Sequence, residues 1–258
     1  MDIKTLGTLS PYPKEDKNCV GYLINNEKSN ILLDCGNGSS RLLSFPQDLD
    51  NLVIIITHLH PDHYGDVFGI INAYNIYKKF NLIKNDLIIL IPYDNRNESS
   101  LDYYSYMQLR SYQNNNIHIF EVVDGEKFLY KNLAIHFKRT YHDIPCNAVK
   151  IISKDNTSIG YTSDTGNKSI DELSEFFKNV DLLISESTFL ESDNILSEYH
   201  LHAFESGLLA EKSNCKQLML THFWPEHSPE EYTDESKRAF ENIITSEEGK
   251  ILKLKALI

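Results

Sequence analysis

The sequence contains few cysteines, no long apolar run and fewer basic than acidic residues. Its four cysteines, Cys19, Cys35, Cys146 and Cys215, lie far apart in 258 residues, which excludes a CxxC motif and a dense disulfide framework. No apolar stretch approaches the roughly 20 residues of a membrane-spanning helix. The first residues, "MDIKTLGTLSPYP", lack the basic start and apolar core of a secretory signal. We therefore expect reduced thiols, no membrane partner and a cytoplasmic location.

The shortage of basic residues bears on the binding partners. Asp and Glu number 37 against 25 Lys and Arg, giving a formal net charge of -12. Proteins that bind long polyanions such as duplex DNA or tRNA usually carry a surplus of Lys and Arg. We therefore expect no stable nucleic-acid binding, whereas a small anionic ligand stays compatible because a metal can neutralise its charge locally.

Short apolar runs alternate with turn signals and helical periods along the chain, without an internal repeat or a low-complexity linker. We therefore expect one domain over residues 1–258. Strands are predicted at 2–8, 20–24, 30–34, 52–57, 87–91, 117–123, 133–140, 148–153, 157–162, 180–186, 216–223 and 251–257. Helices are predicted at 64–80, 98–112, 169–178, 201–213 and 229–243. Strands followed by helices in both halves indicate two sheets with helices outside them.

The stretch "HLHPDH", residues 58–63, follows an isoleucine-rich strand. His58 and His60 are two positions apart, so in extended backbone they point the same way. Pro61 can start a helix that brings Asp62 and His63 to the other side of the same site. Imidazole nitrogens and carboxylate oxygens are zinc ligands. The alternative is a histidine-rich loop that binds nothing.

Three further strands end in a potential ligand: His142 in "KRTYHDIPC", Asp164 in "IGYTSDTG" and His222 in "LMLTHFWP". Loops at strand ends are where a rigid sheet presents catalytic groups. Taken singly, these residues could be a surface histidine, a turn aspartate and a structural histidine. Together with the first segment they give seven ligands, enough for two ions and a bridge.

The order HxHxDH, then His, Asp and His, resembles the metallo-β-lactamase superfamily in its ribonuclease Z-like branch. "NILLDCGNG", with Asp34, resembles an early strand and turn of that family. The resemblance implies an α/β fold, the αββα sandwich of two mixed sheets with helices on the outer faces. It also implies two zinc ions, with manganese as the alternative metal. The implied ligands are His58, His60 and His142 for the first ion, Asp62, His63 and His222 for the second, and Asp164 as the bridge.

Two more segments resemble this branch, "LLISESTFL" and "YHLHAFESGLLA". They imply a catalytic role, beside Asp62, for Glu186 and His200 as the pair that passes a proton to the leaving oxygen. His202 stands where the family commonly has Thr or Ser, and it is the alternative donor. We expect the remaining histidines to be structural or solvent-facing; they are His118, His136 and His227, with His202 if His200 is the donor.

The short segment between His142 and Asp164 indicates the size of the substrate. Enzymes of this branch that mature tRNA carry a protruding arm between the third histidine and the bridging aspartate. Here His142 and Asp164 lie only 22 positions apart, and two strands and a turn fill that segment. The whole chain resembles compact YhfI-like and phage anti-Pycsar proteins, which implies hydrolysis of 3',5'-cyclic mononucleotides (cCMP, cUMP, cAMP or cGMP) and a role against cyclic-nucleotide immune signalling.

The tyrosine-rich segment at 101–113 fits either an amphipathic helix packed at an interface or a lid that stacks on a base. Both fit the homodimer that the resemblance implies. Three other functions remain open: ribonuclease Z-type processing of tRNA 3' ends, hydrolysis of a lactone or thioester, and a non-catalytic nucleotide sponge.

Overall fold

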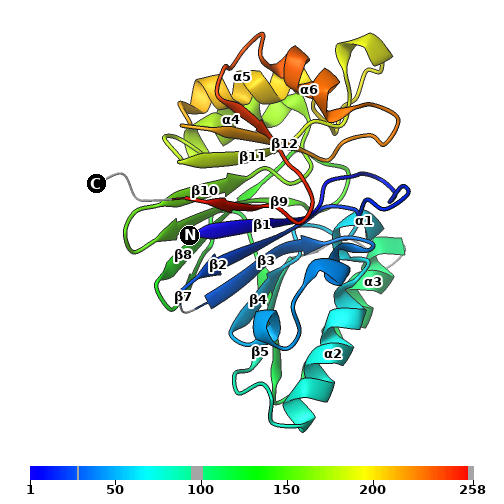
Figure 1. The fold of residues 1–258 in the computed structure, drawn as a ribbon, viewed down its shortest axis with the longest axis vertical. Coiled ribbons are helices and arrows are strands. Elements are labelled where there is room, and N and C mark those ends of the chain that lie inside the picture. Colours follow the sequence, from blue (N-terminus) through cyan, green and yellow to red (C-terminus); the bar gives the residue numbers. More distant parts are fainter. Residues whose placement is uncertain (28, 94–100, 255–258) are drawn as a thin grey trace.

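The computed structural model describes residues 1–27, 29–93 and 101–254. Two sheets stack face to face, and helices cover both outer faces (Figure 1). Both sheets combine parallel and antiparallel neighbours. The expected αββα sandwich of two mixed sheets is therefore confirmed.

The first sheet is built from the N-terminal half of the chain and one late strand. Its order is β14-β1-β2-β3-β4-β5-β6, antiparallel as far as β3 and parallel beyond it. Its strands are β1 (Asp2–Gly7), β2 (Gly21–Asn26), β3 (Ser29–Cys35), β4 (Leu52–Ile55), β5 (Leu87–Pro92), β6 (Ile117–Val122) and β14 (Ile251–Lys253). The helices of this half are α1 (Pro61–Tyr64), α2 (Val67–Lys79) and α3 (Leu101–Arg110), with short 3-10 turns at Ser39–Leu42 and Gln47–Leu49.

The second sheet repeats this plan with the C-terminal half. Its order is β13-β12-β11-β10-β9-β8-β7, antiparallel from β7 to β10 and parallel from β10 to β13. Its strands are β7 (Lys127–Tyr130), β8 (Leu133–Arg139), β9 (Asn147–Ser153), β10 (Ser158–Tyr161), β11 (Leu182–Glu186), β12 (Leu218–Thr221) and β13 (Ile243–Thr245). The helices α4 (Ile170–Phe176), α5 (Ala203–Ser213) and α6 (Pro229–Ser236) lie at the top of Figure 1, with 3-10 turns at Asn167–Ser169 and Glu191–Asp193.

Side chains alternate between the two faces of each strand, which explains why each sheet has a hydrophobic core on both sides. In β3, Ile31 and Leu33 join the core between the two sheets, while Leu32 joins the core beneath α2. Successive strand residues point to opposite faces, so a fully apolar strand serves two cores at once. In β11, Ile184 faces the core between the sheets and Leu183 faces the one beneath α4 and α5. The apolar runs of the sequence are thus explained by sheets covered on both sides.

The predicted elements match the structure with three differences. Strands β7 and β13 were not predicted, and the helix expected over 229–243 ends at Ser236. Parts of two predictions, 98–100 and 255–257, lie outside the described residues. Within the described ranges, none of the helices combines the length and the apolar character needed to cross a membrane.

Candidate metal centre

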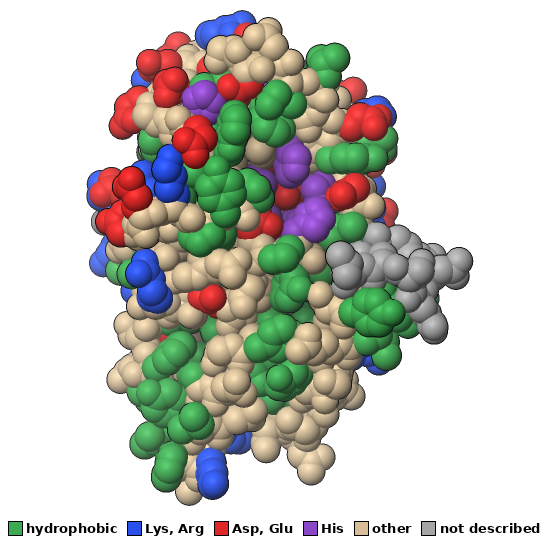
Figure 2. Space-filling model, turned by 90° about the vertical axis from the view of Figure 1, so that its right-hand side faces the viewer, with side chains coloured by type: hydrophobic (Ala, Val, Ile, Leu, Met, Phe, Trp, Pro, Cys, Tyr) green, Lys and Arg blue, Asp and Glu red, His purple; other side chains and the backbone are tan. Residues whose placement is uncertain are grey.

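The predicted site residues meet at one edge of the sandwich, where strands of both sheets end. His58 follows β4, His142 follows β8, Asp164 follows β10 and His222 follows β12. Pro61 is the first residue of α1, as expected, and places Asp62 and His63 in its single turn. Figure 2 shows histidine side chains gathered at one place on this face, beside acidic ones.

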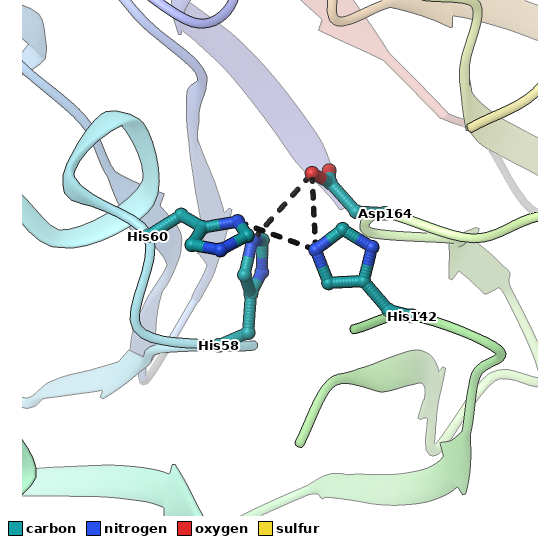
Figure 3. Close-up of side chains that lie close together, drawn as sticks. All are labelled: His58, His60, His142 and Asp164. Carbon is teal, nitrogen blue, oxygen red and sulfur yellow. Dashed lines mark hydrogen bonds and ion pairs between the residues drawn. The ribbon is translucent and has the colours of Figure 1, made fainter. Parts of the chain in front are cut away.

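The first group is formed by three imidazoles and a carboxylate, which point toward one another (Figure 3). Nδ1 of His60 lies 3.2 Å from Nε2 of His58 and 3.2 Å from Nε2 of His142. Oδ2 of Asp164 lies 3.5 Å from Nε2 of His58. Ligand atoms of a tetrahedral zinc ion lie about 3.3 Å apart, because Zn–N bonds measure about 2.0 Å. The spacing of this group therefore suits one ion.

The second group contains Asp62, His63 and His222. Nε2 of His63 and Nε2 of His222 are 3.1 Å apart, and Oδ2 of Asp62 lies 3.7 and 3.5 Å from them. Oδ1 of Asp164 is 3.2 Å from the nitrogen of His63 and 3.1 Å from that of His222. One carboxylate therefore turns one oxygen toward each group, which is the arrangement that a bridging ligand requires.

The imidazoles are held by hydrogen bonds at their other nitrogen. Nδ1 of His63 donates to Asp34 at 2.8 Å, and Nδ1 of His142 donates to the carbonyl of Tyr199 at 3.3 Å. Nδ1 of His222 lies 2.7 Å from the Thr188 hydroxyl. Such bonds fix the tautomer and leave the lone pair of the other nitrogen facing the metal position. Asp34 therefore orients a proposed ligand.

The backbone is locally adapted to hold these groups. Asp34, Ser163 and His222 have φ angles of 55°, 52° and 61°, a left-handed conformation that is uncommon outside glycine and that clusters at functional sites. Gly36 contacts the turn that carries Asp62, because a Cβ at Gly36 would lie 1.8 Å from the Asp62 carbonyl oxygen. A side chain at Gly36 would therefore displace the second group.

A family model for the beta-lactamase superfamily domain matches residues 29–223. The chain belongs to the metallo-β-lactamase superfamily. It is 24% identical to ribonuclease Z of Archaeoglobus fulgidus over 303 aligned positions, covering 95% of each chain. It is 25% identical to the probable metallo-hydrolase YhfI of Bacillus subtilis over 226 positions, covering 86% of each.

Solved structures agree on the fold. The structure of YhfI from Bacillus subtilis superposes with a TM-score of 0.82 at 22% identity, covering 97% of this chain and 98% of that one. The short form of human tRNase Z superposes with a TM-score of 0.74 at 20% identity, covering 99% and 100%. These structures support the fold, and the family match makes the histidine and aspartate cluster the candidate metal centre.

The charges at the site fit divalent cations of the kind that the superfamily binds. Four carboxylates, Asp34, Asp62, Asp164 and Glu186, are buried there. Uncompensated buried charge is strongly unfavourable. Oδ1 of Asp164 is buried and faces the ring nitrogens of His63 and His222 at 3.2 and 3.1 Å. Metal ions would compensate the buried carboxylates between these side chains.

The pKa shifts differ between the two groups. Burial is the main cause that lowers the pKa of His58, His60 and His142, so the first group presents neutral imidazoles with converging lone pairs. Burial also acts to lower the pKa of His63 and His222, but nearby carboxylates, Asp164 foremost, outweigh it and raise both values. Protons thus take the place of cations in the second group, and metal binding there must release them.

Glu186 and His200 lie together beside the second group. Nδ1 of His200 is 3.2 Å from Oε1 of Glu186, and its ring stacks on that of His222 at 5.4 Å between centroids. Burial acts to lower the pKa of His200, but the charge of Glu186 and its hydrogen bond raise it overall. Glu186 is buried, whereas the His200 side chain is 24% exposed. The imidazole can therefore meet a substrate, with its protonated form favoured.

The structure gives the other histidines different contacts. His202 lies just before α5. Its Nδ1 is 3.3 Å from Oε2 of Glu205, and its Nε2 donates to the carbonyl of Ile195. His118 and His227 pair with Asp86 and Asp193. His136 lies on β8, which pairs with β7 and β9.

Hydroxyl and carboxylate groups that the sequence did not indicate also reach the site. Ser10 donates to Oδ2 of Asp62 at 2.8 Å. Oδ1 of Asp143, an exposed side chain, lies 3.1 Å from Nε2 of His142. Thr188 contacts both Glu186 and His222. Thr188 belongs to the segment "LLISESTFL" and Ser10 to the first residues of the chain, and neither stretch indicated the role of its hydroxyl.

Proposed function

We propose that this protein is a two-metal phosphodiesterase that opens the ring of 3',5'-cyclic mononucleotides to give nucleoside monophosphates. His58, His60 and His142 would hold one ion, Asp62, His63 and His222 the other, and Asp164 both. A pair of divalent cations lowers the pKa of water and neutralises charge on a phosphate oxygen. Zinc suits this mixture of nitrogen and oxygen ligands, and manganese is the alternative.

The observation that carries the proposal is the Glu186–His200 pair beside the ligand groups. Opening a cyclic phosphate releases an alkoxide, which needs a proton. His200 offers that proton from Nε2, because its Nδ1 faces Glu186 at 3.2 Å. An imidazole oriented by a carboxylate is a suitable general acid near neutral pH. Hydrolysis of a lactone or thioester makes no particular demand for this pair.

A small substrate is favoured by the segment between two of the ligands. His142 and Asp164 are connected by β9, a short turn at 154–157 and β10, which pair as an antiparallel hairpin. The arm by which enzymes of the ribonuclease Z type would hold tRNA has no counterpart in this segment. The net charge of -12 also disfavours a long polyanion.

The second candidate function is processing of tRNA 3' ends. It is supported by the similarity to a ribonuclease Z over 95% of both chains. A nucleotide sponge is less well supported, because binding alone gives no reason for Asp164 to face both ligand groups.

The substrate assignment is tested by incubating the metal-loaded protein with cyclic mononucleotides, cyclic dinucleotides and pre-tRNA, with products resolved by chromatography and gels. We expect cyclic mononucleotides, pyrimidine ones included, to become nucleoside monophosphates while pre-tRNA stays intact. Trimmed pre-tRNA with untouched cyclic nucleotides would establish the second candidate instead. A sponge would bind the cyclic nucleotides and return them unchanged after denaturation.

The proposal includes a homodimer in which α3 lies at or near the interface and the site. Tyr104 and Met107 are exposed on this helix, whereas Tyr106 is buried and donates to Glu121. Light scattering at micromolar concentration should give about twice the 29.8 kDa chain mass. Tyr104→Asp should shift the protein to the monomer, while Leu129→Asp on the distant strand β7 should not. A monomeric unsubstituted protein would contradict the dimer.

A further inference from the structure

Thr188 connects the two functional parts of the site. It lies two residues beyond the end of β11 and is buried. Its Oγ1 is 2.7 Å from Oε2 of Glu186, 2.7 Å from Nδ1 of His222 and 3.3 Å from Nδ1 of His200. A single hydroxyl thus contacts the carboxylate of the proton-donor pair and an imidazole of the second ligand group.

The protons in this network can be assigned from the donor capacity of each group. A threonine hydroxyl has one proton to donate, and an ionised carboxylate can only accept. Thr188 must therefore donate to Glu186 and accept from Nδ1–H of His222. This orients the ring of His222 and directs its Nε2 toward Asp62 and Asp164, at 3.5 and 3.1 Å.

Contacts at both carboxylate oxygens hold Glu186 in place. Its Oε1 accepts from the Thr165 amide at 2.7 Å and faces Nδ1 of His200 at 3.2 Å. Its Oε2 accepts from Thr188 at 2.7 Å and from the Leu201 amide at 3.2 Å. These contacts fix the carboxylate between the ring of His200 and the hydroxyl of Thr188.

The geometry points to a double role for Glu186: it acts on His200 directly and on His222 through the hydroxyl of Thr188. Thr188 is then a positioning residue for the second metal. Carboxylates that hydrogen-bond a metal-binding histidine raise its basicity and fix its ring, and removing them costs about 10- to 100-fold in metal affinity. Here a hydroxyl is inserted between the carboxylate and the histidine. The inference rests on the ligand roles in the proposed function.

The test is zinc binding to metal-free protein, measured by competition with a chromophoric chelator and without any substrate. Thr188→Val removes the hydroxyl at nearly constant shape and should weaken the second equivalent of zinc about 10- to 100-fold. The first equivalent should keep its affinity. Thr188→Ser keeps the hydroxyl and should bind like the unsubstituted protein.

A second measurement reports the proton on Nδ1 of His222 directly. Ring ¹⁵N shifts of His222 in metal-free protein should show Nδ1 carrying a proton, and Thr188→Val should change these shifts while Thr188→Ser should not. Unchanged zinc affinity together with unchanged shifts in Thr188→Val would overturn the relay.

Variants of the proton-donor pair separate the two roles. Glu186→Gln should both weaken the second zinc and slow turnover, whereas His200→Ala should only slow turnover. If Thr188→Val does not fold, full zinc affinity in Glu186→Gln overturns the relay in its place. An unsubstituted protein that binds fewer than two equivalents would instead contradict the proposed function.

Discussion

An Asp164→Asn variant is expected to bind less than one equivalent of zinc, where the unsubstituted protein is expected to bind two, and to lose at least about 10³-fold in kcat/KM. The carboxylate turns Oδ2 toward the first ligand group and Oδ1 toward the second. An asparagine offers one neutral oxygen and an NH₂ group that cannot ligate, so it cannot bridge. Paired cations contribute several kcal/mol to the reaction, and each 1.36 kcal/mol corresponds to about tenfold in rate.

Elemental analysis after metal-replete purification measures the stoichiometry, and initial rates give kcat/KM. Asp62→Asn is the matched variant, because Asp62 belongs only to the second group; it should keep close to one equivalent. Asp171→Asn, at a carboxylate that is 87% exposed and paired with Lys212, should behave like the unsubstituted protein. Two retained equivalents in Asp164→Asn would show that this residue is not the bridge.

A His200→Ala variant is expected to turn over cyclic nucleotides about 10²- to 10⁴-fold more slowly, the usual contribution of a general acid. Its metal content should stay at two equivalents, because His200 is proposed as a proton donor and lies outside both proposed ligand sets. Steady-state rates and elemental analysis of the same preparation measure the two effects separately.

His202→Ala is the matched control for this prediction. His202 precedes α5, and its ring contacts Glu205 and the carbonyl of Ile195. Alanine keeps the backbone amide and loses only these ring contacts, which should cost stability on the order of 1 kcal/mol and leave turnover nearly unchanged. Full activity in His200→Ala with loss of activity in His202→Ala would move the proton-donor role to His202.

The residues brought together at the site could be named from the sequence because each belongs to a segment with a distinctive order. His58, His60 and His63 are spaced for a strand end followed by a helical turn, and the structure has both. The hydroxyl of Ser10 reaches Asp62 across 52 positions of sequence. Serine and threonine are common and make local hydrogen bonds everywhere, so no spacing marks the few that orient a ligand.

The two strands that were not predicted are short: β7 pairs with the adjacent strand β8, whereas β13 depends on a distant partner. β13 (Ile243–Thr245) is three residues long and pairs with β12, about 25 positions earlier in the chain. The helical period that predicts 229–243 is correct where α6 begins, at Pro229, after Ser228 with its hydrogen bonds to Glu231. The prediction is wrong at the C-terminal end of the helix. There β13 pairs with β12, and local periodicity does not report such a long-range contact.

The division of the site between the two sheets has a consequence for how the protein matures. The first half of the chain contributes His58, His60, Asp62 and His63, and the second half contributes His142, Asp164 and His222. A chain emerging from the ribosome holds only part of either ligand set until the second sheet has formed and docked. With the proposed ligands, metal uptake would therefore come late in folding, after the two halves have met.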